Sequence, residues 1–333
     1  MYGPSLAPIS VVRRLGYGGT NMQEAGLLLG VLQPSSVTTD PMTLRNILLA
    51  TDFSECSERA LSYALGIASR YESRLHLFHC IDPTPYNLVE PDAVQTARDD
   101  ARRELERLAS DLRRGRAKNV EVKVVAEAGD LAVILPRVVK DLDLGLIVVG
   151  THGRTGWRKL VLGSVAEIVV DQVSCPVLSV GPSANRTRIQ EFGPENILLA
   201  REASARSQLA ESYASSLARK YGSRLTVVDV LENRWGRVVA QVSQLEWCEA
   251  ERGNTILDRA VTSTLQLPTE IGTQSDLILQ VADHTAADLM VLAVPAAHRF
   301  AARFLSTNLY RVVCDAPCPV LTVHARPERS LDQ

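Results

Sequence analysis

The chain contains an internal repeat, which limits its fold more than any other feature of the sequence. Three short segments recur 143 or 150 positions later: NILLA of residues 46–50 at 196–200, YESRL of 71–75 as YGSRL at 221–225, and CPVL of 175–178 at 318–321. Matches at such a domain-sized spacing indicate an internal duplication. The 333 residues should therefore form two copies of one fold.

Within the first copy, short apolar runs alternate with helical patterns. The runs predict strands at residues 46–51, 75–81, 120–126, 144–149 and 176–180. The helical patterns predict helices at residues 54–68, 91–114, 129–142 and 164–172, the third kinked at Pro136. Such alternation predicts an α/β protein with two tandem Rossmann-like open parallel five-stranded sheets, each with helices on both faces.

A glycine-rich stretch, residues 148–164 (VVGTHGRTGWRKLVLGS), follows the fourth predicted strand. Gly150, Gly153 and Gly163 would allow a backbone to approach a ligand closely. Ser164 stands where the next helix begins, and helix N-termini bind anions through their free N–H groups and the helix dipole. We interpret the stretch as a phosphate-binding loop.

Asp52 and Gly150 each lie at the carboxyl end of a predicted strand, where parallel sheets bind ligands. They should therefore share one edge of the sheet. Asp52 and Ser164 are both also suited to cap helices, and capping alone remains an alternative for each. We do not expect His152 to act as a general base, because the motif pairs no carboxylate with it.

Composition argues against a nucleic-acid-binding protein and against a membrane-spanning one. The net charge is −2, and the arginines of the predicted 91–114 helix alternate with acids, which indicates a solvated helix face and not a nucleic-acid surface. No apolar run is long enough to span a membrane. The six cysteines form no metal or disulfide pattern, so a cytoplasmic location is expected. We predict a disordered tail at 1–43, a linker at 182–193 and a second tail at 326–333.

Several motifs of the first half resemble one known family. The spacing of Gly150, Gly153, Gly163 and Ser164 is similar to the nucleotide-binding signature of the universal stress proteins, which belong to the adenine-nucleotide hydrolase-like superfamily. The segments 51–54 (TDFS) and 175–178 (CPVL) also resemble that family. The resemblance covers residues 44–181 in the right order, and residues 194–325 in strand pattern only.

This resemblance implies an ATP site in the first half. Asp52, next to Thr51, would contact the adenosine, and Cys80 would line the adenine pocket. The remaining implied ligand residues would surround the ribose and phosphates: Gly150, His152, Gly153, Arg154, Gly163, Ser164 and the amide of Val165. Mg²⁺ or Mn²⁺ would be held mainly by the phosphates, and no metal site on the protein is expected.

The second half lacks this signature. Ala293, Ala296 and Ser306 stand at the positions of the three glycines, and Glu202 stands at the position of Asp52. Each added Cβ would lie where the backbone should meet phosphate, so we predict a folded domain that binds no ATP. Residues 177–180 and 320–323 should pair with each other and cover their sheet edges.

These patterns favour a nucleotide-binding stress-response or signalling protein, whose state is read by a protein partner not identifiable from the sequence. Two alternatives stay open: a slow ATPase or a nucleotidyl- or phosphotransferase, and a scaffold that binds no nucleotide. Further homodimerisation also stays open, as does whether residues before Met42 are translated.

Overall fold

The computed structural model describes residues 44–84, 92–115, 117–152, 164–184, 193–202, 208–232, 238–250, 254–265, 273–294 and 308–324. The predicted tails at 1–43 and 326–333 lie outside these residues, as do residues 185–192 of the predicted linker.

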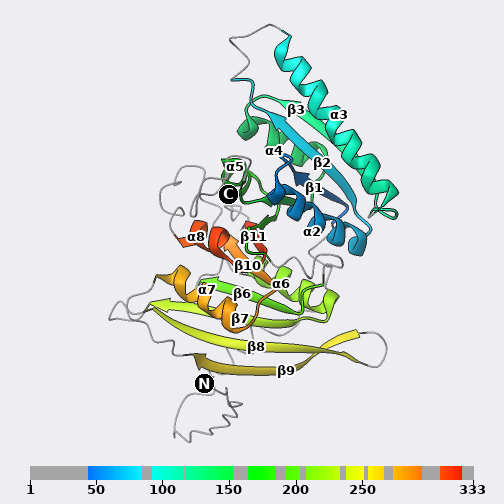
Figure 1. The fold of residues 1–333 in the computed structure, drawn as a ribbon. Helices are drawn as coiled ribbons and strands as arrows, with labels where there is room; N and C mark the ends of the chain where they lie inside the picture. The colour runs from blue at the N-terminus through cyan, green and yellow to red at the C-terminus, as the bar shows by residue number, and fades with distance from the viewer. Residues whose placement is uncertain are drawn as a thin grey trace, which may run out of the picture. The chain divides into compact units, whose positions relative to one another are not determined.

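The first half forms the predicted parallel sheet, in the order β3-β2-β1-β4-β5 (Figure 1). Its strands are β1 (Asn46–Ala50), β2 (Arg74–Ile81), β3 (Val122–Ala128), β4 (Leu146–Gly150) and β5 (Val177–Val180). Its helices are α2 (Glu55–Tyr71), α3 (Ala93–Arg114), α4 (Leu131–Asp141) and α5 (Ser164–Gln172). Every predicted element of this half is thus confirmed, with bounds that shift by a few residues. Pro136 lies inside α4.

The second half repeats this arrangement in part. Its strands are β6 (Asn196–Glu202), β7 (Arg224–Glu232), β8 (Val238–Ala250), β9 (Asn254–Leu265), β10 (Leu289–Val294) and β11 (Val320–His324). Its helices are α6 (Gln208–Tyr221), α7 (Gln274–His284) and α8 (Asn308–Asp315). Strands β7, β6, β10 and β11 pair in parallel and correspond to β2, β1, β4 and β5.

The outer part of the second half differs from the predicted five-stranded parallel sheet. Where the first half has α3 followed by β3, the second has the hairpin of β8 and β9, which pairs antiparallel with β7. The hairpin segments are rich in β-branched residues, which favour strands over helices. The α/β class and the tandem arrangement are as predicted, but the described part of this half contains six strands.

The two halves join through their last strands. β5 pairs antiparallel with β11, with Leu178 opposite Leu321, so the described strands form one eleven-stranded sheet. The Thr322 hydroxyl also donates to the Val177 carbonyl at 3.2 Å. The predicted pairing within the chain is confirmed, and it removes two of the four edges that separate sheets would have.

Alternate residues of each strand face opposite layers of helices. Ile47 and Leu49 of β1 pack in the cluster that contains α2, α3 and α6, whereas Leu48 and Ala50 pack in the cluster that contains α4, α5, α7 and α8. Each cluster runs across both halves of the sheet. These two apolar layers fix the carboxyl ends of the strands, where the candidate site lies.

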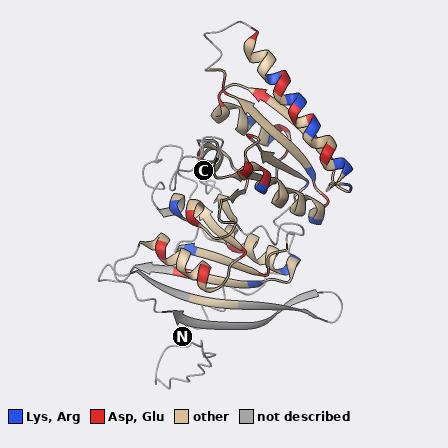
Figure 2. Cartoon of the chain, in the orientation of Figure 1, with Lys and Arg blue, Asp and Glu red and all other residues tan. Residues whose placement is uncertain are grey.

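The charged helix α3 covers β2 and β3 with its apolar side. Leu105, Ala109 and Leu112 are buried, while acidic and basic residues alternate along the rest of the helix (Figure 2). Arg102 lies 3.2 Å from Glu106 in an exposed pair one turn apart. The predicted solvated face is therefore observed, with its charges paired along the helix.

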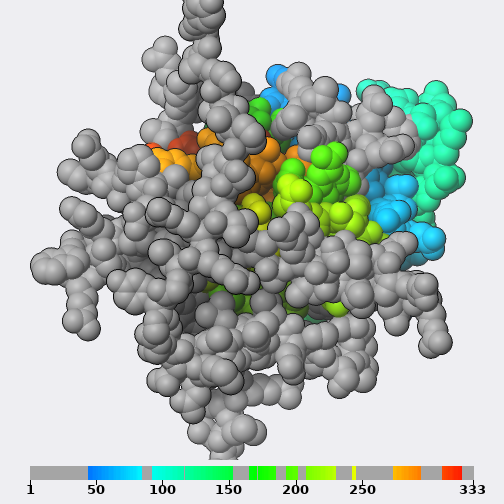
Figure 3. Space-filling model, turned by 90° about the horizontal axis from the view of Figure 1, so that it is seen from below, coloured from blue at the N-terminus to red at the C-terminus, as the bar shows by residue number. Residues whose placement is uncertain are grey.

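Helices α2 and α6 meet end to end through equivalent residues. The Tyr71 and Tyr221 rings lie 6.4 Å apart edge to face, the Lys220 ammonium lies 5.0 Å above the Tyr71 ring, and Arg70 lies 5.6 Å above the Tyr221 ring. Arg70 also donates to the Lys220 carbonyl at 3.0 Å. Figure 3 shows the surface of α6 beside that of α2. These cation–π contacts tie the halves together at a second place.

Candidate functional site

The sheet of the first half changes direction between β1 and β4. From β1 the chain proceeds to β2 and β3 on one side, and then crosses to β4 and β5 on the other. The register pairs Ala50 with Val149, so Thr51 and Gly150 extend to the same level at the carboxyl edge. Ligands of open α/β sheets bind at this kind of switch point. The predicted meeting of the β1 and β4 ends is therefore observed.

The turn after β1 is held by its own side chains. The Thr51 hydroxyl accepts the Phe53 amide at 3.0 Å and donates to the Ser57 hydroxyl at 3.0 Å. One Asp52 carboxylate oxygen accepts the Ser54 amide at 3.0 Å, and Ser54 is the N-cap of α2. Ser54 is thus the residue that caps α2, whereas Asp52 closes the turn before it.

Phe53 takes a backbone conformation that is costly for a side-chain-bearing residue. Its φ is 61°, in the left-handed region. Its ring lies 5.0 Å from the His79 ring, and His79 Nδ1 lies 2.7 Å from the Thr51 carbonyl, to which it must donate. No local pattern predicts this contact, because it joins residues 28 positions apart. Strained residues of this kind cluster at functional sites.

Packing inside the protein is one reason why position 150 is a glycine. A Cβ at this position would lie 2.9 Å from the carbonyl carbon of Cys56 and 3.0 Å from its oxygen. The end of β4 therefore packs directly on the first turn of α2. The glycine sets the distance between the two turns that border the switch point, and its proposed contact with a ligand stays a prediction.

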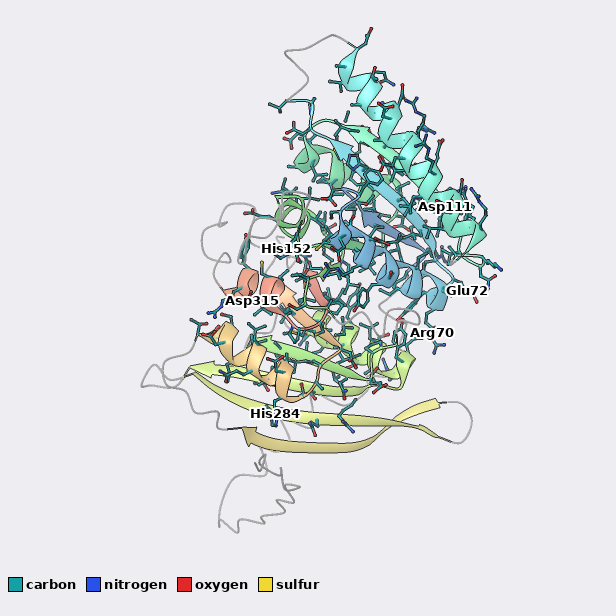
Figure 4. The ribbon with its side chains drawn as sticks, in the orientation of Figure 1. Arg70, Glu72, Asp111, His152, His284 and Asp315 are labelled. Carbon is teal, nitrogen blue, oxygen red and sulfur yellow. The ribbon has the colours of Figure 1, made fainter. Side chains whose placement is uncertain are left out.

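His152 follows β4 and is partly buried. Its Nδ1 lies 2.8 Å from the Thr151 hydroxyl. Burial lowers the pKa of His152, and the Arg59 guanidinium lowers it further, against an opposing effect of the Asp315 carboxylate of α8. Figure 4 labels His152 and Asp315. The lowered pKa favours the neutral imidazole at pH 7. The Asp315 carboxylate, which belongs to the second half, acts on this pKa from across the chain.

Cys80 lies near the carboxyl end of β2, level with Asp52. Its thiol points to the Gly129 carbonyl, 3.6 Å away, and lies against the apolar layer of α4. Burial, and then the nearby carboxylates of Glu127, Asp130 and Asp82, raise the pKa of Cys80 to about 11. The thiol is a small, uncharged part of the wall at this edge.

The raised pKa predicts an unreactive thiol. At pH 8 the thiolate fraction of Cys80 should be about two-hundredfold lower than that of an ordinary cysteine, so iodoacetamide should label it slowly. The same shift stabilises the folded protein below about pH 8.5, and this contribution disappears as the pH rises toward 11. Peptide mass analysis after timed labelling would measure the rate, with urea-unfolded protein as control. Equal rates in both states would contradict the assignment.

The loop between β4 and α5 lies mostly outside the described residues. This holds for Gly153, Arg154 and Gly163, so their predicted roles stay untested. α5 begins at Ser164, as predicted, and Val165 has 39% of its surface exposed. The first amides of a helix lack partners within it, so the start of α5 offers N–H groups to an anion.

Comparison with known proteins identifies the family. The sequence profile of the universal stress protein family matches residues 43–181 and again residues 194–324. The chain belongs to the universal stress protein family. A universal stress protein by name from Staphylococcus saprophyticus is 32% identical over 146 residues, which cover 42% of this chain and 84% of that protein. The chain thus carries two universal stress protein repeats.

Solved structures show the same fold. The crystal structure of a universal stress protein from Archaeoglobus fulgidus superposes with a TM-score of 0.60 at 18% identity, covering 85% of this chain and 99% of the other. A functionally unknown protein from Pseudomonas aeruginosa superposes with a TM-score of 0.54 at 17% identity, covering 86% and 95%. At such identities the likeness concerns the fold, and here it extends over both repeats.

The second universal stress protein repeat carries an ion-pair cluster at the matching place. Arg201, the counterpart of Thr51, donates from Nε and Nη2 to both oxygens of Asp229, at 2.5 and 2.7 Å. Its Nη1 donates to Glu211 of α6 at 2.9 Å. Asp229 is the counterpart of His79, so a bidentate pair replaces the Thr51–His79 contact. The partners raise the pKa of Arg201, which stays charged.

Proposed function

We propose that the chain is a nucleotide-dependent stress-response or signalling protein that binds one ATP, at the switch point between β1 and β4. The contrast between the repeats supports this most directly. The first repeat has small or neutral groups at the carboxyl edge, Thr51 and Gly150, beside a helix N-terminus. The second has the large, fixed side chain of Arg201 at the equivalent level.

Each predicted ligand group has a role in this proposal. Asp52, exposed in part beside the strained turn, accepts from the ribose or base of adenosine. Cys80, level with it on β2, supplies an apolar wall for adenine. The amides of the loop and of Val165 at the start of α5 bind the phosphates, with His152 and Arg154 beside them.

The divalent cation is proposed to arrive with the nucleotide. Among the described residues, no group of three or more His, Cys, Asp and Glu side chains is placed to hold a metal ion. Mg²⁺ or Mn²⁺ would therefore be coordinated by phosphate oxygens and water, as Mg²⁺ usually is in nucleotide sites. The protein would contribute the amides that position the phosphates.

We propose a binding protein without its own catalytic role, read by a protein partner. Slow hydrolysis of ATP or transfer of a phosphoryl or nucleotidyl group is the alternative. Such chemistry would need a base, and the nearest candidate is His152. Its Nδ1 is held by the Thr151 hydroxyl, and no carboxylate in the described part of the chain forms a hydrogen bond with its ring.

The proposed location is the cytoplasm. Five cysteines are described, and all five are free thiols, four of them buried. Reduced, buried cysteines fit a reducing compartment. No helix in the described part of the chain has the length and apolar character needed to cross a membrane.

Calorimetry of the full chain with an unhydrolysable ATP analogue and Mg²⁺ tests the proposal. We expect one site per chain. Asp52→Ala should weaken binding about tenfold or more, because it removes a charged acceptor. Glu202→Ala, the matched change in the second repeat, should leave affinity within about twofold. Gly153→Val should abolish binding with the fold intact by circular dichroism. Two sites per chain, or equal effects of both carboxylate changes, would contradict the proposal.

A further inference from the structure

The carboxyl end of β11 reaches across to the first repeat. His324, the last residue of β11, has its Nε2 2.7 Å from the carbonyl oxygen of Val170 in α5. A carbonyl oxygen can only accept, so the imidazole Nε2–H is the donor. The contact joins residues 154 positions apart and belongs to neither repeat alone.

The bonded carbonyl lies at a helix end that needs a partner. α5 spans Ser164–Gln172, so Val170 is among its last four residues, whose carbonyls receive no N–H from within the helix. His324 therefore acts as a C-terminal cap supplied by the other repeat. Val170 itself is only 7% exposed, and the bond forms where water has little access. Hydrogen bonds of this kind are costly to leave unmade.

The same helix carries the proposed phosphate-binding end. α5 has nine residues and is therefore about 13 Å long. Ala166 and Val169 are almost fully buried against the sheet, so the helix is packed along its length. A rigid helix that is fixed at its last turn is also fixed at its first turn, where Val165 is 39% exposed.

The opposite contact is missing, although the repeats are related by pseudo-symmetry. At the offset of 143, His324 corresponds to Gly181 and Val170 to Val313. A Cβ on Gly181 would lie 3.9 Å from the Val313 carbonyl oxygen, so the two positions do face each other there as well. Of these two equivalent positions, only the one in the second repeat carries a side chain with a donor. The cap is thus directed at α5, the helix of the proposed site, and not at α8.

We infer that His324 of the second repeat is a positioning residue for the nucleotide site of the first. The inference rests on the proposed function, and it explains how the repeat without the glycine signature contributes to binding. Through β11 that repeat holds α5 in place, so that the helix amides meet the phosphates. ATP affinity should therefore depend on a residue that does not touch the nucleotide.

The test uses the full chain and three variants. His324→Leu keeps the volume and removes the donor, and His324→Gln keeps an N–H that can reach the carbonyl. Thr322→Val removes a different side-chain bond between the repeats, which ends on β5 and not on α5. We expect His324→Leu to weaken binding of the ATP analogue about five- to tenfold, with His324→Gln and Thr322→Val within about twofold of the original chain.

Hydrogen exchange without nucleotide separates this inference from the proposed function. Amides of α5 should exchange faster in His324→Leu and at the original rate in Thr322→Val. If the original chain binds no ATP analogue, the proposed function fails, and exchange alone still decides whether His324 holds α5. Unchanged affinity and unchanged exchange in His324→Leu would overturn the inference. A loss of affinity for the ATP analogue in His324→Gln as large as that in His324→Leu would also overturn the inference.

Discussion

Gly150→Ala should destabilise the protein by about 2–3 kcal/mol, because the new methyl group meets backbone and not a flexible side chain. The Cβ would lie 2.9 Å from the Cys56 carbonyl carbon, so either β4 or the first turn of α2 must move. The melting temperature should fall by roughly 3–5 °C, measured by scanning calorimetry of the full chain.

Gly181→Ala is the matched control for this change. It adds the same methyl group at the end of β5, where the nearest atom, the Thr151 hydroxyl oxygen, would be 3.7 Å away. That is an ordinary contact, so stability should change by less than about 0.5 kcal/mol. Equal effects of the two alanines would show that the packing of β4 on α2 does not require a glycine.

Arg201→Met should lower the free energy of unfolding by about 2–3 kcal/mol at pH 7. The arginine is the shared partner of Asp229 and Glu211, whose side chains are 17% and 20% exposed. Without it, these two largely buried carboxylates lose the cation that they share. Urea titration of the full chain would measure the change as a shift of the midpoint at constant slope.

Arg74→Met provides the comparison for Arg201→Met. Arg74 lies 2.9 Å from Glu121, but the two side chains are 44% and 49% exposed. Water screens such a pair, so its loss should shift the urea midpoint far less than Arg201→Met does. If Arg201→Met lowers the free energy of unfolding no more than Arg74→Met does, water screens the Arg201 cluster as it screens the exposed pair. Arg201 would then not be a fixed side chain at the edge of the second repeat.

The elements of the first repeat could be predicted because their patterns are local. The apolar run that forms β1 and the start of α2 near Ser54 each depend on residues only a few positions away. The β5–β11 pairing could also be predicted, since two equivalent apolar strands at the ends of their repeats need partners. In contrast, the hairpin of β8 and β9 could not be predicted from the repeat, because none of the three recurring segments lies within it.

The parts of the site that could not be predicted depend on contacts between distant residues. The sequence marks Gly150 as special, but only the fold brings Cys56 against it and explains why. The substitution of Thr51 by Arg201 could be read from the offset alone, whereas its pairing with Asp229 requires the register of β6 and β7. His324 has no local signature, because its partner is a backbone carbonyl of the other repeat.

The pairing of β5 with β11 also has a consequence during synthesis. β5 ends at Val180 and β11 begins at Val320, so about 140 residues must follow before β5 gains its neighbour. At ordinary ribosome speeds this takes roughly 7–28 s. Over that interval the nascent first repeat exposes the unpaired edge of a finished strand, with the apolar residues Val177, Leu178 and Val180, to other chains. A chaperone bound to this edge, or slow pairing between two nascent chains, would compete with correct assembly, and chains truncated before β11 should aggregate.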